Sequence, residues 1–90
     1  MASNLWVQAR SREETQFEGE AKSVSTVNDK GILDILPSHE NFISIVKDHL
    51  IIAVQDGKSV KIDLSGPAVV RVVENRVYIY LVSARPSYQL

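Results

Sequence analysis

The residues most able to do chemistry are few and lie in predicted turns. The chain has two histidines, and each sits beside a carboxylate, in His39-Glu40 and in Asp48-His49. Two such pairs in neighbouring loops could converge on a metal ion. Ligand-type residues this sparse in polar segments are, however, more often ordinary turn residues. We therefore predict no metal site.

Nucleophilic and acid–base chemistry has equally little support. The chain contains no cysteine, and no serine lies in a Gly-x-Ser-x-Gly elbow. The carboxylates Glu13 and Glu14 are adjacent in a polar turn, where neighbouring side chains diverge. The glycines are isolated and none opens a predicted helix, so no phosphate-binding loop is expected. These observations predict a protein that is not an enzyme and has no cofactor.

The composition predicts one small globular domain that spans residues 1–90. Ten basic and eleven acidic residues give a net charge of −1, which favours neither nucleic acid nor an anionic membrane as a partner. No apolar run approaches the roughly 18 residues that span a bilayer. The N-terminus lacks the basic and apolar regions of a signal peptide. We therefore expect a cytoplasmic protein with no direct membrane insertion.

The elements that would carry these residues are short strands. Apolar and polar residues alternate in residues 5–10, a period of two that is typical of a half-buried strand. Further strand-like runs cover residues 15–17, 20–28, 32–36, 42–46, 50–55, 58–64, 68–73 and 76–82. No stretch has the apolar period of a helix. The pattern predicts an all-β fold, a β-sandwich or flattened barrel of about nine or ten short strands.

A hairpin is predicted at Asp56-Gly57, because a type I′ turn needs two residues that tolerate positive φ. Lys47-Asp48-His49 is predicted as a turn between the two preceding strands. A two-residue hairpin loop directs Ile52 and Val54 away from the core. The same register puts one apolar patch on the core side, formed by Ile51, Ala53, Val60 and Ile62.

A second hairpin is predicted around Glu74-Asn75. Its core face consists of Ala68, Val70, Val72, Val77, Ile79 and Leu81. Its other face is amphipathic and consists of Val69, Arg71, Val73, Arg76, Tyr78 and Tyr80. Tyrosine and arginine are enriched in interface cores, which favours a protein partner for this face. The alternative is a sandwich face half-covered by the protein's own loops.

Several short motifs follow one another in a characteristic order. Phe17-Glu18-Gly19 comes first, then Gly31 leading into Ile35-Leu36-Pro37-Ser38-His39, then Phe42-Ile43-Ser44. Asp56-Gly57, Ser65-Gly66 and the run from Val72 to Val77 follow. Over residues 5–84 this order resembles the epsilon subunit of the F-type ATP synthase, which is called delta in mitochondria. The resemblance covers the N-terminal β-sandwich of that subunit, without the C-terminal helical hairpin.

The resemblance implies a non-catalytic rotor subunit of the central stalk. In the family this domain binds the gamma subunit and rests on the c-ring, and so couples the two during ATP synthesis and proton transport. It implies a location peripheral to the inner or plasma membrane, reached through the ATP synthase complex. Without the helical hairpin, we expect neither self-inhibition nor nucleotide binding. The alternative function is a free-standing β-sandwich module that binds a protein or a ligand.

The resemblance also implies where partners bind. The c-ring side would be the segment from residue 31 to 42, with Gly31, Ile32, Asp34, His39 and Phe42. The gamma-facing surface would include Arg71, Tyr78 and Tyr80. Several residues depart from the family pattern. Ile32 and Asp34 stand where the loop after Gly31 usually carries Glu and a second Gly, Ser38 replaces the Gly of Pro-Gly-His, and Gly66-Pro67 replaces the Gly-Gly that follows Ser.

Overall fold

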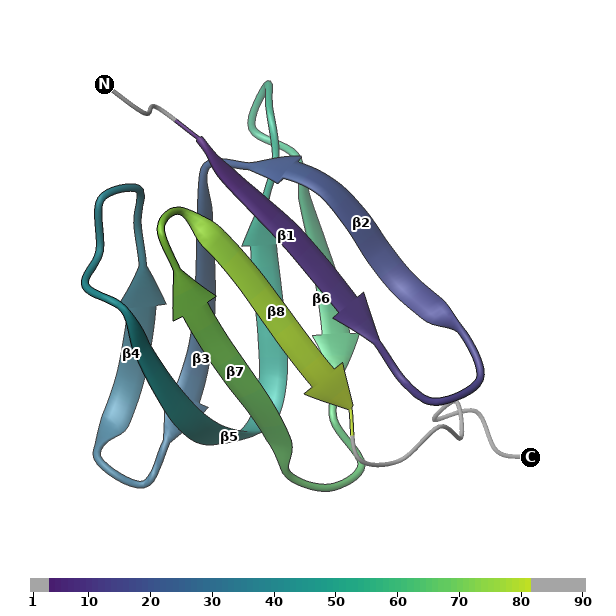
Figure 1. Ribbon diagram of the computed structural model, residues 1–90. Coiled ribbons are helices and arrows are strands. Elements are labelled where there is room, and N and C mark those ends of the chain that lie inside the picture. The colour runs from purple at the N-terminus through teal and green to yellow at the C-terminus, as the bar shows by residue number, and fades with distance from the viewer. Residues whose placement is uncertain (1–3, 82–90) are drawn as a thin grey trace.

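The computed structural model describes residues 4–81, which form eight strands and no helix (Figure 1). The strands are β1 (Leu5–Arg10), β2 (Thr15–Ala21), β3 (Ser23–Asn28), β4 (Gly31–Ile35), β5 (Phe42–Ala53), β6 (Ser59–Asp63), β7 (Ala68–Val73) and β8 (Arg76–Leu81). Because there is no helix in this range, none of sufficient length and hydropathy to cross a membrane is found there.

The strands form two layers that share β5 (Figure 1). Sheet A has the order β2-β1-β8-β7-β5 and uses the first half of β5, residues 42–46. Sheet B has the order β4-β3-β5-β6 and uses the second half. Fourteen buried apolar side chains fill the space between the layers, and among the largest are Leu5, Ile35, Leu50, Ile52 and Ile79. The predicted all-β sandwich or flattened barrel is confirmed.

The turn predicted at Lys47-Asp48-His49 is wrong, because these residues lie inside strand β5. The segment is part of one 12-residue strand, in which Asp48 has φ 74°. The pairing with β3 shifts register at this point, as expected of a β-bulge that bends a strand from one layer into the other. Thr26 Oγ1 donates to the His49 carbonyl (2.7 Å), and the Leu64 N–H donates to the Asp48 carbonyl (2.9 Å). The merged strand reduces the predicted count to eight among residues 4–81.

The predicted strand over residues 20–28 is also wrong, because a bend at Lys22 separates β2 from β3. The Lys22 N–H leaves the ladder and donates to the carbonyl of Ala53 (2.7 Å). The bend changes the phase of the alternation, so Ala21 and Val24 are both buried, although a continuous strand would place them on opposite faces. The strand predicted over residues 15–17 is longer in the structure and continues through Gly19 to Ala21.

The hairpin between β5 and β6 forms where it is predicted, with a different register. Asp56 and Gly57 both have positive φ, 63° and 72°. The Val54 N–H donates to the Lys58 carbonyl, which offsets the pairing by one residue, so Ile52 lies opposite Val60. A one-residue slip exchanges the two faces of a strand. Ile52 is therefore fully buried and Val54 packs on the core, contrary to the prediction that both point outward.

The hairpin of β7 and β8 has the predicted turn and faces. Val73 lies opposite Arg76, and Glu74 and Asn75 both have positive φ, 49° and 67°. The six predicted core residues of this hairpin are buried, or, in the case of Leu81, packed against the core. Strand β1 also forms as predicted and pairs in parallel with β8. The predicted end of the last strand at residue 82 lies outside the described residues.

Candidate partner interface

The histidines do not come together. His39 lies in the loop before β5, whereas His49 lies within β5, opposite Asp63 of β6. The His39 ring packs on Phe42 with centroids 4.9 Å apart, and its Nδ1 lies 3.1 Å from the Glu40 carbonyl. In the part of the chain from residue 4 to residue 81, no three side chains of ligand type gather at one point.

A shallow hollow lies beside the β7–β8 turn. Its volume is about 220 Å³, which is below the range of about 300–1,000 Å³ usual for small-molecule sites. The hollow is open and is lined by Asn4, Leu5, Trp6, Glu20, Glu74, Asn75 and Arg76. Its size and openness do not favour a ligand-binding module.

The outer surface of sheet A carries several exposed apolar and aromatic side chains. Strand pairing brings side chains from β1, β8, β7 and β5 into three rows across it. One row runs from Arg10 through Tyr80 and Val69 to Ile45. We call this surface the arginine–tyrosine face, and it comprises Trp6, Arg10, Ile43, Ile45, Val69, Arg71, Val73, Arg76, Tyr78 and Tyr80.

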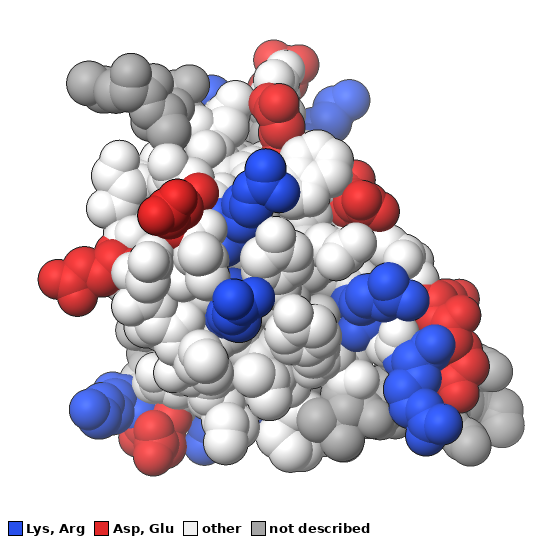
Figure 2. Space-filling model, viewed as in Figure 1, with Lys and Arg blue, Asp and Glu red and all other residues white. Residues whose placement is uncertain are grey.

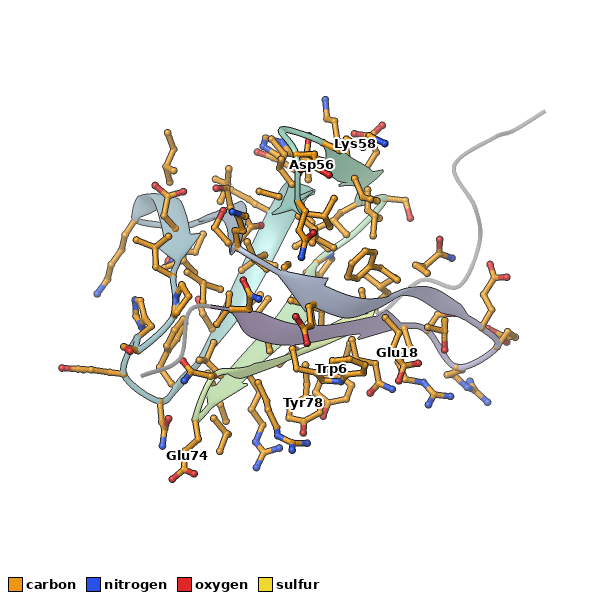
Figure 3. The ribbon with its side chains drawn as sticks, turned by 90° about the horizontal axis from the view of Figure 1, so that it is seen from above. Trp6, Glu18, Asp56, Lys58, Glu74 and Tyr78 are labelled. Carbon is orange, nitrogen blue, oxygen red and sulfur yellow. The ribbon has the colours of Figure 1, made fainter. Side chains whose placement is uncertain are left out.

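Large apolar side chains on this face are exposed. Ile43 and Ile45 each expose 67% of their surface, Tyr80 exposes 43% and Trp6 exposes 39%. Trp6 and Tyr78 project from the same side of sheet A, away from sheet B (Figure 3). Contiguous exposed apolar surface of this kind marks an interaction site more often than isolated exposed side chains do.

Among residues 4–81, no carboxylate lies within ion-pair distance of the arginines of the face, although Glu18 and Glu20 of β2 lie opposite Gln8 and Trp6 on the same side of sheet A. The ion pair found within residues 4–81 joins Lys61 to Asp63 of β6 (3.9 Å), in the other sheet. The guanidinium of Arg71 instead lies over the ring of Tyr78, 5.7 Å from its centroid, which is a weak cation–π geometry at an exposed site. Figure 2 shows blue arginine and lysine atoms within a white field, with most red carboxylates toward its margin. The face therefore combines apolar area with arginines that form no ion pair within residues 4–81.

The residues predicted to face gamma lie together. Arg71, Tyr78 and Tyr80 are all on the arginine–tyrosine face, with Arg71 directly opposite Tyr78. Tyr80 is partly exposed and is not a core residue, so the predicted register of this hairpin is confirmed.

The residues predicted for the c-ring side do not lie together. Gly31 and Ile32 begin β4 at the β3–β4 turn, and Ile32 is 81% exposed. His39 and Phe42 lie in and after the loop at the other end of β4, separated by the length of that strand (Figure 1). Asp34 lies between the two groups, and its carboxylate accepts a hydrogen bond from Ser25 Oγ (2.7 Å). The two groups therefore lie at opposite ends of β4.

Four members of the arginine–tyrosine face were not predicted from the sequence: Trp6 and Arg10 of β1, and Ile43 and Ile45 of β5. The alternation in residues 5–10 does place Trp6 and Arg10 on the side of the strand that faces away from the core. The alternation gives no information about the parallel pairing of β1 with β8, and this pairing places those two side chains beside the tyrosines.

No family model and no curated protein sequence matches the chain. Among the solved structures that share its fold are two mitochondrial ATP synthases. A chain of the mitochondrial ATP synthase of Euglena gracilis, in its assembly of OSCP, F1 and c-ring, superposes with a TM-score of 0.84 and 17% identity over 96% of this chain. A chain of the central stalk and c-ring of the Tetrahymena thermophila mitochondrial ATP synthase superposes with a TM-score of 0.74 and 13% identity over 88% of this chain.

The matched chains are longer than this one. This chain spans 55% of the length of the Euglena chain and 63% of the Tetrahymena chain. At these identities the comparison establishes fold. The chain therefore has the β-sandwich fold that occurs in chains of these two mitochondrial ATP synthase structures.

Proposed function

We propose that this protein is a non-catalytic central-stalk subunit of an F-type ATP synthase. The observation that carries the proposal is the superposition on a chain of the Euglena ATP synthase over 96% of the sequence. The order of short motifs from Phe17 to Val77, which resembles the epsilon family, supports it independently. In this role the protein links a gamma subunit to the c-ring and so contributes to coupling ATP synthesis to proton transport.

The proposed gamma-binding surface is the arginine–tyrosine face. Its composition supports this assignment, because tyrosine, tryptophan and arginine supply most of the binding energy in many protein interfaces. Its arginines, which form no ion pair among the described residues, favour a partner surface that carries carboxylates among apolar side chains. A sheet packed on a dry core also presents these residues on a rigid support.

The proposed c-ring contact is the β3–β4 turn with Gly31 and Ile32. In the epsilon family the position of Ile32 lies near the polar loops of the c subunits, and Ile32 is the most exposed large apolar side chain described here. His39 and Phe42 lie at the opposite end of β4 and are not part of this contact. The protein would then sit at the membrane surface without entering the bilayer.

Two variants of equal charge change test the gamma contact. Arg71→Glu reverses a charge on the arginine–tyrosine face, and Lys61→Glu makes the same reversal on the exposed outer side of sheet B. The chain and the gamma subunit of the same organism are mixed and analysed by size-exclusion chromatography and mass spectrometry. We expect a 1:1 complex for the original chain and for Lys61→Glu, and its loss for Arg71→Glu. If the original folded chain forms no complex with folded gamma, the proposed function is wrong.

A further inference from the structure

The loop from residue 36 to residue 41 is joined to the β7–β8 turn by two asparagine side chains. The Oδ1 of Asn75 accepts a hydrogen bond from the Ser38 N–H (2.6 Å). The Oδ1 of Asn41 accepts one from the Glu74 N–H (2.9 Å). Each asparagine thus reaches from its own segment to the backbone of the other, so the two segments hold each other in place.

Both segments contain residues in the left-handed backbone region, which L-residues other than asparagine and glycine rarely adopt. Ser38 has φ 71° and Glu74 has φ 49°. Such conformations persist where surrounding contacts determine them, and they are concentrated at functional sites. Here the N–H groups of both residues are the donors in the two asparagine bonds, so these bonds stabilise the unusual conformations.

The joined segments lie at the edge of the arginine–tyrosine face. The Asn75 carbonyl accepts a hydrogen bond from the N–H of Trp6, which belongs to that face (2.9 Å). The loop presents Leu36, which is 54% exposed, and His39. It lies at the end of β4 away from Ile32, and so on the gamma side rather than the ring side of the proposed arrangement (Figure 1).

We propose that Asn41 and Asn75 are positioning residues that extend the arginine–tyrosine face onto the 36–41 loop. The gamma-type partner that docks on that face would then also contact Leu36 and His39. This inference rests on the proposed function. A loop already fixed in its bound conformation loses little conformational freedom on association, and this raises affinity without adding any contact.

Substitutions at Asn75 separate positioning from direct contact. Asn75→Gly removes the side-chain acceptor and keeps a residue suited to φ 67°, so the turn and the fold should persist. Asn75→Asp keeps an acceptor oxygen in the same place and serves as the matched control. Leu36→Ala removes an expected contact and leaves both asparagine bonds intact.

Two measurements are made on each full-length variant: affinity for purified gamma subunit by calorimetry, and exchange of the Ser38 amide hydrogen by NMR. For Asn75→Gly we expect faster Ser38 exchange and gamma binding weakened by about tenfold. For Asn75→Asp both quantities should remain near those of the original chain. Leu36→Ala should weaken gamma binding with Ser38 exchange unchanged.

The outcomes distinguish this inference from the proposed function. Unchanged gamma affinity in Asn75→Gly, together with faster Ser38 exchange, would show that the loop is fixed but takes no part in docking. Weaker binding without faster exchange would overturn the positioning role. If the original chain does not bind gamma at all, both the inference and the proposed function fail.

Discussion

Glu74 has a backbone conformation that better suits glycine or asparagine. It is the first central residue of the β7–β8 turn, with φ 49°, and type I′ turns strongly prefer Asn or Gly there. The left-handed conformation costs a non-glycine residue about 1–2 kcal/mol, and less for asparagine. We therefore expect Glu74→Asn to raise the free energy of unfolding by about 1 kcal/mol. Urea denaturation measures this, with Glu74→Ala as the control that removes the charge and keeps the strain.

The hydroxyl group of Thr26 should also make a measurable contribution to the free energy of unfolding. It is buried, and its hydroxyl donates to the His49 carbonyl at the β5 bulge. Thr26→Val keeps the shape and removes the donor, which should cost about 1–3 kcal/mol of unfolding free energy. Thr26→Ser keeps the hydroxyl and loses one methyl group, for about 1 kcal/mol. A smaller loss in Thr26→Val than in Thr26→Ser would mean that packing, and not the hydrogen bond, is what matters at this site.

At the scale of the elements, the register of the β5–β6 hairpin gives the clearest stability test. Ile52 is fully buried between the sheets, while its neighbour Ile51 lies on the outer side of sheet B and is only partly covered. Ile52→Ala should therefore lower the free energy of unfolding by about 2–5 kcal/mol. Ile51→Ala should cost much less. Thermal unfolding of both variants measures these losses. A larger loss for Ile51→Ala than for Ile52→Ala would instead support the predicted two-residue loop and its register.

The elements also show why the sequence predicts some strands correctly and not others. The β7–β8 hairpin was predictable because its alternation is regular and its turn is two residues long. At Lys22 and Asp48, within polar segments, the backbone bends so that the buried and exposed positions exchange. The apolar–polar alternation on each side of the bend remains regular. Residue types alone do not distinguish such a bulge from a turn, since both suit polar residues. The one-residue offset of the β5–β6 pairing, at the hydrogen bond from the Val54 N–H to the Lys58 carbonyl, could not be predicted for the same reason.

At the scale of the whole molecule, the candidate site depends on pairings between distant parts of the chain. Arg71, Tyr78 and Tyr80 were predictable because they lie on one hairpin. Trp6 joins them only through the parallel pairing of β1 with β8, and Ile43 only through the pairing of β5 with β7. No local pattern determines which strands become neighbours, so the four members of the face on β1 and β5 were not predictable from the sequence.

The same distant pairings should govern the rate of folding. All-β domains built from non-local pairings fold in milliseconds to seconds, so we expect a folding rate of about 1 to 1,000 per second. Val70→Ala, in the local β7–β8 hairpin, should mainly slow folding, whereas Val7→Ala in β1 should mainly accelerate unfolding. Stopped-flow measurements over a range of urea concentrations separate the two effects. Identical changes in both rates for the two variants would contradict a folding order in which the β7–β8 hairpin forms before β1 pairs with it.

The open edge of β4 has a consequence for the behaviour of the isolated protein in concentrated solution. Within residues 4–81, β2 and the first half of β5 end sheet A, and β4 and β6 end sheet B. Lys61 and Asp63 on β6, and Glu18 and Glu20 on β2, provide the charges that discourage pairing with another chain. On β4 the exposed Ile32 stands next to Gly31, and Asp34 is the one charged side chain of the strand. A ring contact at this edge would therefore also protect the assembled protein from aggregation, whereas the isolated protein would have this edge uncovered.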